Sequence, residues 1–199
     1  MLKNPAVRVI AAVAALLAVA AGLLLYTPLG RQLWQGENSA GEALIGGPFR
    51  LIDQNGQART DADFHGQFLL VYFGYSNCPD ACPTTLQMFT TALDKLGPDA
   101  SKVTPIFITV DPDRDTPQVL KAYAANFTPR LVALSGSAAD IAAAAKVYRI
   151  YYKKVGEGAD YSMDHTALVY LVGPDGRYIA HYSTETTADD LVKDLRQRF

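Results

Sequence analysis

The sequence has few cysteines, few charges and no internal repeat. Only two of its 199 residues are cysteine, too few for a small protein held together by a disulfide framework. Charged residues make up 19% of the chain, the formal net charge is −2, and lysine and arginine form no cluster, which argues against nucleic-acid binding. No segment repeats at a period of about 20–50 residues, which excludes a solenoid. The 15 glycines and 11 prolines are ordinary numbers and exclude a collagen-like or disordered chain.

The first 35 residues differ in charge and hydropathy from the rest. They contain Lys3, Arg8 and Arg31 but no acidic residue, whereas the remaining 164 residues carry a net charge of −5. Residues 9–26 form an uncharged, largely apolar run of 18 residues. A helix of about 18–22 residues rises about 27–33 Å, close to the thickness of the bilayer hydrocarbon. We therefore predict a transmembrane anchor over residues 9–29.

The flanking charges predict how this anchor is oriented. Positive residues stay on the cytoplasmic side, which places residues 1–8 in the cytoplasm and the body of the protein outside. The alternative is a cleaved signal peptide, because Ala18-Val19-Ala20 resembles a cleavage site. That cut would fall inside the apolar run, which favours the anchor. The sequence thus predicts a bacterial inner-membrane protein with a linker over residues 30–45 and a periplasmic domain over residues 46–199.

The pattern of the body predicts an α/β domain. Short apolar or alternating runs predict strands at residues 49–52, 57–60, 68–75, 103–110, 131–134, 167–172 and 178–182. Apolar residues at helical spacing and capping residues predict helices at residues 84–96, 116–126, 137–148 and 187–199. Strands that alternate with helices and end in an antiparallel hairpin indicate a mixed sheet. With a cysteine motif directly after the first central strand, this order is typical of a thioredoxin-like fold.

The two cysteines, Cys78 and Cys82, lie between a buried strand and the start of a helix. Backbone N–H groups and the helix dipole favour anions there, so we expect both thiolates to be stabilised. The helix could start at Pro79 or at Pro83. A structural disulfide is the simpler alternative, but its five-residue loop would contribute only about 2 kcal/mol, against nearly 5 for a loop of about 100 residues. Three intervening residues, one more than in Cys-x-x-Cys, open a wider bite for a metal ion.

One of three histidines is a candidate metal ligand. His65 is predicted in a loop, and His181 in a strand and half-buried. His165 directly precedes the strand at residues 167–172, where the entering loop of a thioredoxin-like chain faces the cysteine motif. Two thiolates and an imidazole suit Cu(I), and with a weak fourth ligand they suit Cu(II), whereas structural zinc needs a fourth strong ligand. Met163 could supply a thioether or simply pack in the core.

Three separated segments carry a resemblance to a known family: GGPFRLIDQNGQARTDADFHGQFLLVYFGYSNCPDACP, TVDPDRDTP and YSMDHTALVYLVGPDG. From about residue 46 to its end, the chain resembles the Sco/SenC family of membrane-anchored copper chaperones for cytochrome c oxidase assembly. The resemblance implies copper ligands at Cys78, Cys82 and His165. It also implies delivery of copper to the dinuclear centre of oxidase subunit II, or reduction of that subunit's cysteines.

The oxidising periplasm implies two further partners. A Cys78–Cys82 disulfide cannot bind Cu(I), so a thiol reductant is needed alongside a periplasmic copper donor.

Two carboxylates could support this site. The segment from Asp111 to Asp115 resembles the opening of a calcium loop, but Thr116 and Ala122 stand where glycine and glutamate are required, which excludes that function. Asp111 and Asp164 could each orient a ligand or hold charge near copper. Equally, each could be an ordinary carboxylate, with Asp111 capping the next helix.

The tyrosine- and lysine-rich segment at residues 148–154 is predicted to be an ordinary strand, with a docking surface as the alternative.

Three other functions compete with the chaperone. A thiol–disulfide oxidoreductase needs Cys78 and Cys82 but not His165. A peroxiredoxin-type peroxidase would need a Pro-x-x-x-Thr-x-x-Cys approach that the sequence before Cys78 lacks. A copper or redox sensor could use the same three residues, and only its binding partner would distinguish it.

Overall fold

The computed structural model describes residues 13, 15 and 45–199, and the chain divides into two compact units, residues 1–43 and 44–199. The predicted cytoplasmic segment at residues 1–8, and almost all of the predicted anchor and linker, lie outside the described residues. Among the residues that are described, no helix combines the length and apolar character needed to cross a bilayer. The membrane anchor therefore stays a prediction.

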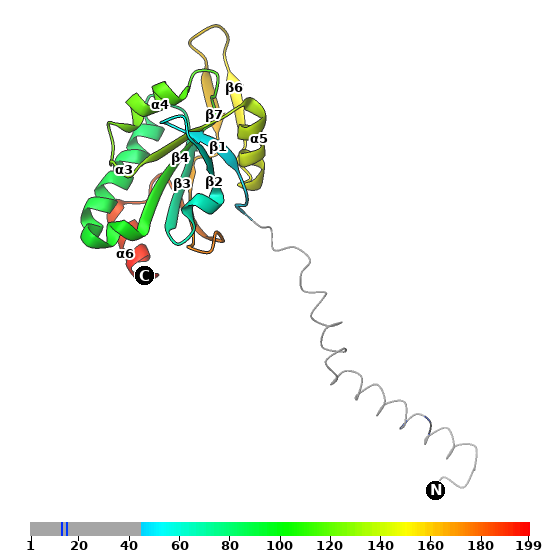
Figure 1. Cartoon of the computed structure of the whole chain (residues 1–199), viewed down its shortest axis with the longest axis vertical. Helices are drawn as coiled ribbons and strands as arrows, with labels where there is room; N and C mark the ends of the chain where they lie inside the picture. Colours follow the sequence, from blue (N-terminus) through cyan, green and yellow to red (C-terminus); the bar gives the residue numbers. More distant parts are fainter. Residues whose placement is uncertain (1–12, 14, 16–44) are drawn as a thin grey trace. The chain divides into compact units, whose positions relative to one another are not determined.

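A seven-stranded mixed sheet forms the centre of residues 45–199 (Figure 1). Its strands lie in the order β2-β1-β5-β4-β3-β8-β9, and β3, β4 and β5 are parallel, while the other neighbours are antiparallel. The bounds are β1 (Arg50–Asp53), β2 (Ala58–Thr60), β3 (Phe68–Gly74), β4 (Val103–Thr109), β5 (Val132–Ser135), β8 (Leu168–Val172) and β9 (Tyr178–Ser183). The predicted mixed sheet is confirmed, with strand boundaries shifted by no more than one residue.

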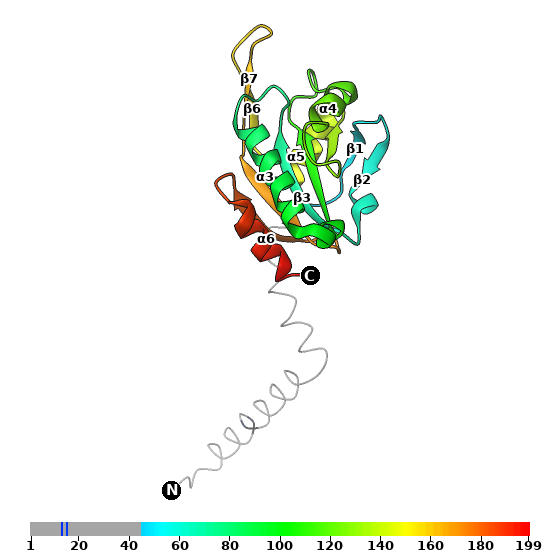
Figure 2. The ribbon, with the colours of Figure 1, turned by 90° about the vertical axis from the view of Figure 1, so that its left-hand side faces the viewer.

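Helices cover both faces of this sheet. They are α3 (Ala81–Leu96), α4 (Pro117–Ala124), α5 (Ala138–Val147) and α6 (Ala188–Arg196), with 3-10 turns η2 (Asp61–Phe64) and η3 (Gly97–Lys102). Figures 1 and 2 show α3, α4 and α6 on one face and α5 on the other. The predicted starts of α4, α5 and α6 are confirmed, and the hydroxyls of Thr116, Ser137 and Thr187 accept backbone N–H groups in the first turns of these helices.

The central strands are buried on both sides because both of their faces carry helices. β3 and β4 are apolar almost throughout, and their register pairs Tyr72 with Phe107 and Gly74 with Thr109. Tyr72 contacts Cys82 near the start of α3, whereas the next residue, Phe73, packs on Tyr148 at the end of α5. This alternation anchors the end of β3 on both faces, directly before the loop that follows it.

A separate two-stranded sheet is the main feature that differs from prediction. β6 (Tyr152–Val155) pairs antiparallel with β7 (Ser162–His165), so His165 ends a strand rather than lying in a loop. The predicted strand at residues 148–154 is partly correct, but Tyr148 caps α5 and is buried, and only the part from Tyr152 is extended. Local periodicity missed β7 because its four residues have no apolar alternation.

Candidate metal centre

The cysteine motif lies at the carboxyl end of β3, where the chain turns into α3. The helix begins at Ala81, so neither Pro79 nor Pro83 is its first residue, and Pro83 occupies the first turn. Cys78 therefore lies in the loop before the helix and is half-buried, while Cys82 is fully buried within the first turn. Both are free thiols.

Gly74 makes room for the second cysteine. A Cβ atom on Gly74 would lie 2.7 Å from the Cys82 sulfur and 2.8 Å from the Phe107 ring, closer than real Cβ contacts. The last residue of β3 must therefore be glycine for Cys82 to pack against the end of the strand.

The two thiols have opposite electrostatic environments. The backbone N–H of Cys82 donates to the Cys78 sulfur at 3.4 Å. Hydrogen bonds from Cys82, first from its thiol and then from its backbone, lower the pKa of Cys78 to about 5. The interaction with Cys78, followed by burial, raises the pKa of Cys82. The expectation that both thiolates are stabilised is thus wrong for the metal-free protein, because two adjacent sulfurs in a buried place do not both ionise easily.

We expect Cys78 to react with iodoacetamide as a thiolate over most of the accessible pH range. Because its pKa is depressed to about 5, the alkylation rate should stay near its plateau from pH 8 down to about pH 6 and fall only below that. Mass spectrometry of the reduced chain after timed alkylation measures this rate at Cys78, and Cys82 serves as the internal control that stays unmodified while folded. A rate at Cys78 that drops tenfold per pH unit already below pH 8 contradicts the prediction.

His165 presents a defined nitrogen to the cysteines. Its Nδ1 lies 3.1 Å from the Thr166 carbonyl oxygen, which can only accept, so Nδ1–H is the donor. In the neutral ring the lone pair is then on Nε2, 3.8 Å from the Cys82 sulfur. Thr166 is itself held by Tyr151, whose carbonyl accepts from the Thr166 N–H at 2.9 Å and whose N–H donates to the Thr166 hydroxyl at 3.1 Å. This backbone pair orients the imidazole as metal-binding histidines are usually oriented.

The separation between Cys82 and His165 fits a shared metal ion. Metal–sulfur bonds of about 2.3 Å and metal–nitrogen bonds of about 2.0–2.1 Å, opened to about 120°, separate the two donors by about 3.8 Å. In the part of the chain that the structure describes, no three such side chains already stand in a metal-binding arrangement. A metal bound by all three donors therefore needs a small local movement of the cysteine loop or of the β6–β7 hairpin.

The other predicted residues take different places. Asp111 is buried, accepts hydrogen bonds from Tyr161 and Arg114, and does not cap α4, whose cap is Thr116. Asp164 is exposed opposite Lys153 in the hairpin, and its role stays a prediction.

Met163, His65 and His181 take no part in the contacts between the cysteines and His165. Met163 packs against the core, in agreement with the packing alternative. His65 lies in a loop as predicted, whereas the expectation of a half-buried His181 is wrong, because His181 is exposed on β9 and bonds to the Tyr178 hydroxyl at 2.6 Å.

Sequence reasoning missed Asp115, which organises the cysteine loop. This fully buried carboxylate accepts from the Ser76 backbone N–H at 3.0 Å, from the Ser76 hydroxyl, and from the Thr109 hydroxyl at 2.6 Å. Its own backbone carbonyl accepts from the Ser135 hydroxyl at 2.7 Å. Asp115 therefore ties the loop after β3 to the ends of β4 and β5. The sequence showed only a cluster of aspartates, and nothing in it distinguished the buried one.

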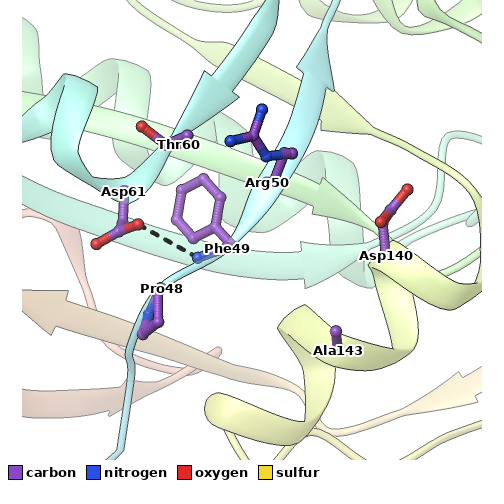
Figure 3. A pocket seen from close by; sticks show the side chains of 7 residues that line it. All are labelled: Pro48, Phe49, Arg50, Thr60, Asp61, Asp140 and Ala143. Atoms are coloured by element: carbon purple, nitrogen blue, oxygen red, sulfur yellow. Dashed lines mark hydrogen bonds between the residues drawn. The ribbon is translucent and has the colours of Figure 1, made fainter.

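A hollow elsewhere on the domain has a different character (Figure 3). Its volume is about 380 Å³, and Pro48, Phe49, Arg50, Thr60, Asp61, Asp140 and Ala143 line it. Asp61 accepts from the Phe49 backbone N–H at 3.3 Å, so this carboxylate is used to hold the start of the domain. Neither cysteine nor His165 lines this hollow, and the chemistry of the molecule is centred on the cysteines instead.

The fold and this site define a class of protein. A thioredoxin-like domain that places two free thiols, one of them ionised, against an oriented imidazole can exchange thiols or hold a soft metal ion.

Comparison with known proteins narrows this class to a family. Residues 37–199 match the family model described as SCO1/SenC, and the chain belongs to that family. It is 40% identical over 162 residues to the human protein named SCO1 homolog, mitochondrial, covering 78% of this chain and 53% of that protein. The chain thus spans about half the length of that curated relative.

Two solved structures agree with this family assignment. Bradyrhizobium japonicum ScoI with copper bound is 47% identical, with a TM-score of 0.73 over 78% of this chain and 99% of that one. BsSco, in which a disulfide switch is identified and which is described as a member of the Sco family of cytochrome c oxidase assembly proteins, is 30% identical. Its TM-score is 0.63 over 77% of this chain and 92% of that one.

Proposed function

We propose that this protein is a copper chaperone that binds one copper ion through Cys78, Cys82 and His165 and supplies it during cytochrome c oxidase assembly. The observation that carries the proposal is the placement of the His165 Nε2 lone pair 3.8 Å from the Cys82 sulfur, beside a second sulfur in the preceding loop. Two soft sulfurs and one imidazole without a fourth strong ligand favour Cu(I) and also accommodate Cu(II). The relatives with copper bound support this assignment.

The arrangement also suits transfer rather than storage. Cys78 is half-exposed and ionised in the metal-free protein, so it can be the first sulfur to meet an incoming ion. Cys82 is fully buried, and together with His165 it completes the site, with Cys82 losing its proton as the metal binds. A three-ligand site leaves one side open to a ligand from an acceptor. The proposed acceptor is the dinuclear copper centre of oxidase subunit II, and the proposed donor is another periplasmic copper protein.

Its proposed location is the bacterial inner membrane. The uncharged run at residues 9–26 and the basic residues before it support a single anchor over residues 9–29, with the domain in the periplasm. Because the periplasm is oxidising, a thiol reductant is needed to keep both cysteines available.

Replacing the histidine tests the proposed ligand set. We expect His165→Ala to weaken Cu(I) binding by more than about a hundredfold, since even loss of a group that only orients a ligand typically costs about 10–100-fold. Competition with a chromophoric Cu(I) chelator measures the affinity of the reduced chain. His181→Ala is the matched control, because that imidazole is exposed on β9. Equal affinities of the two variants would remove His165 from the site.

A thiol–disulfide oxidoreductase is the second candidate, and the depressed pKa of Cys78 favours it. The Cys78 thiolate would attack a disulfide of the target, which releases one target thiolate and forms a mixed disulfide. Cys82 would then attack Cys78, giving a Cys78–Cys82 disulfide and the fully reduced target. His165→Ala separates the two functions, because it should retain reduction of a model disulfide while losing copper.

A further inference from the structure

The β6–β7 hairpin, which carries His165, has few attachments to the rest of the domain. Its two strands pair only with each other and are not hydrogen-bonded into the seven-stranded sheet. Between Tyr151 and Thr166, all of which the structure describes, Tyr161 alone is buried. A cavity of about 150 Å³, lined by both Tyr161 and Met163, lies between the hairpin and the loop after β4. Tyr152 and Met163 pack against the edge of the core, and the His165 ring lies edge-on to Tyr72 and Tyr75, with ring centroids 6.1 Å apart in each pair. Beyond these contacts, the position of the hairpin depends on a few specific polar contacts.

The polar contacts between the hairpin and the loop after β4 converge on one arginine. Arg114 donates from Nη1 to the backbone carbonyls of Tyr161 at 2.9 Å and of Ala159 at 3.3 Å. Its guanidinium lies over the Tyr161 ring, 3.6 Å from the centroid, and its Nε donates to Asp111. The Tyr161 hydroxyl donates to the other oxygen of Asp111 at 2.6 Å. Arg114, Asp111 and Tyr161 thus form a closed cluster, which we call the latch.

The loop that bears the latch also holds the cysteines. Within residues 110–115, Val110 donates its N–H to the Gly74 carbonyl at 2.8 Å, and Asp115 binds the backbone and hydroxyl of Ser76. The same short loop is therefore hydrogen-bonded both to the start of the cysteine loop and to the β6–β7 hairpin. Because Tyr161 immediately precedes β7, which ends at His165, a displacement at the latch is transmitted along one short strand to the imidazole.

We propose that Arg114 is a positioning residue for metal binding: acting through Tyr161, it holds the hairpin where His165 can share a metal ion with the two cysteines. The proposal rests on the proposed copper function. Without the latch the hairpin samples positions in which Nε2 is out of reach, and the affinity falls in proportion to the fraction of molecules that stay competent.

The test is a double-mutant cycle on the reduced 199-residue chain in mild detergent. Cu(I) affinity is measured by competition with bicinchoninate for wild type, Arg114→Met, His165→Ala and the double variant. We expect Arg114→Met to weaken binding about tenfold, corresponding to a competent fraction of about one tenth. In the His165→Ala background the same substitution should change the affinity less than about twofold, because the latch acts only through that imidazole.

Two further variants sharpen the cycle. Tyr161→Phe removes the hydroxyl bond to Asp111 but keeps the ring, so it should weaken binding less than Arg114→Met, and it replaces that variant in the cycle if Arg114→Met does not fold. Lys154→Met is the matched control, because the Lys154 ammonium also lies over the Tyr161 ring, at 3.6 Å from the centroid, but this side chain is exposed and makes no hydrogen bond within the described residues. It should leave the affinity unchanged.

A metal-free measurement distinguishes positioning from general stability. In Arg114→Met, amide hydrogen exchange should accelerate across residues 152–165 and stay unchanged in β3 and β4. The latch proposal is overturned if Arg114→Met lowers the Cu(I) affinity equally in the presence and absence of His165. It is also overturned if Arg114→Met changes neither the affinity nor the hydrogen exchange, and in both cases the proposed ligand set still stands. If His165→Ala itself leaves copper binding intact, the proposed ligand set fails and the latch proposal falls with it.

Discussion

Replacement of either cysteine by serine is expected to abolish copper binding. A serine hydroxyl is a hard, neutral donor at neutral pH, and a soft ion such as Cu(I) selects thiolates. With Cys78→Ser or Cys82→Ser, the metal recovered with the reduced chain after removal of free copper should fall from about one ion per chain to less than about one tenth. Elemental analysis together with a thiol count measures this. A Cys78→Ser variant that keeps its full copper content contradicts the proposed site.

The two serine variants should differ in stability even though both lose copper. Cys78 is half-exposed, so its replacement should change the free energy of unfolding by no more than about 0.5 kcal/mol. Cys82 is fully buried between Gly74 and Tyr72, and a buried hydroxyl there should cost about 1–3 kcal/mol. A chemical control avoids substitution altogether. Oxidation of the wild-type pair to a disulfide should block copper uptake, and reduction should restore it.

Asp115→Ala is expected to destabilise the fold by about 2–4 kcal/mol. The substitution removes the acceptor of the Ser76 N–H, the Ser76 hydroxyl and the Thr109 hydroxyl. Thr109 is fully buried, whereas Ser76 is half-buried. An unsatisfied buried donor costs about 1–3 kcal/mol, which applies in full to the Thr109 hydroxyl, and the two half-buried Ser76 donors each cost less than that. Urea denaturation of the metal-free, reduced chain measures the change.

Asp113→Ala is the matched control for this prediction. Asp113 belongs to the same turn but is exposed, so its replacement should stay within about 0.5 kcal/mol of wild type. If Asp115→Ala costs less than about 1 kcal/mol, water reaches the freed donors and the network around Ser76 does not hold the cysteine loop.

The order of elements was predictable because local patterns encode it. Continuous apolar runs marked β3 and β4, and Thr116, Ser137 and Thr187 marked three helix starts, all of which the structure confirms. β7 was not predictable in this way, because Ser162–His165 is paired only with β6 and packs little against the core. Its extended conformation comes from that pairing rather than from its own apolar pattern.

The sequence allowed the candidate ligand residues to be predicted, but not the hydrogen bonds that hold them in place. The spacing of Cys78 and Cys82 after a buried strand drew attention to them, and the position of His165 before β8 pointed to the same end of the sheet. Nothing in the sequence distinguished the roles of Asp111, Asp113 and Asp115. In the structure, Asp111 accepts a hydrogen bond from Tyr161, Asp113 is exposed, and Asp115 accepts hydrogen bonds from Ser76.

By itself, the sequence determined which donors are available, which segments form the central sheet, and the soft character of any metal they would bind, because these properties reside in residue types and short periodicities. Only the tertiary structure decided that an imidazole 83 residues from Cys82 faces its sulfur, that one of two adjacent thiols is ionised, and that Arg114 and Asp115 hold the two halves of the site together. Burial and hydrogen bonding between distant segments set those features, and no local pattern encodes such contacts.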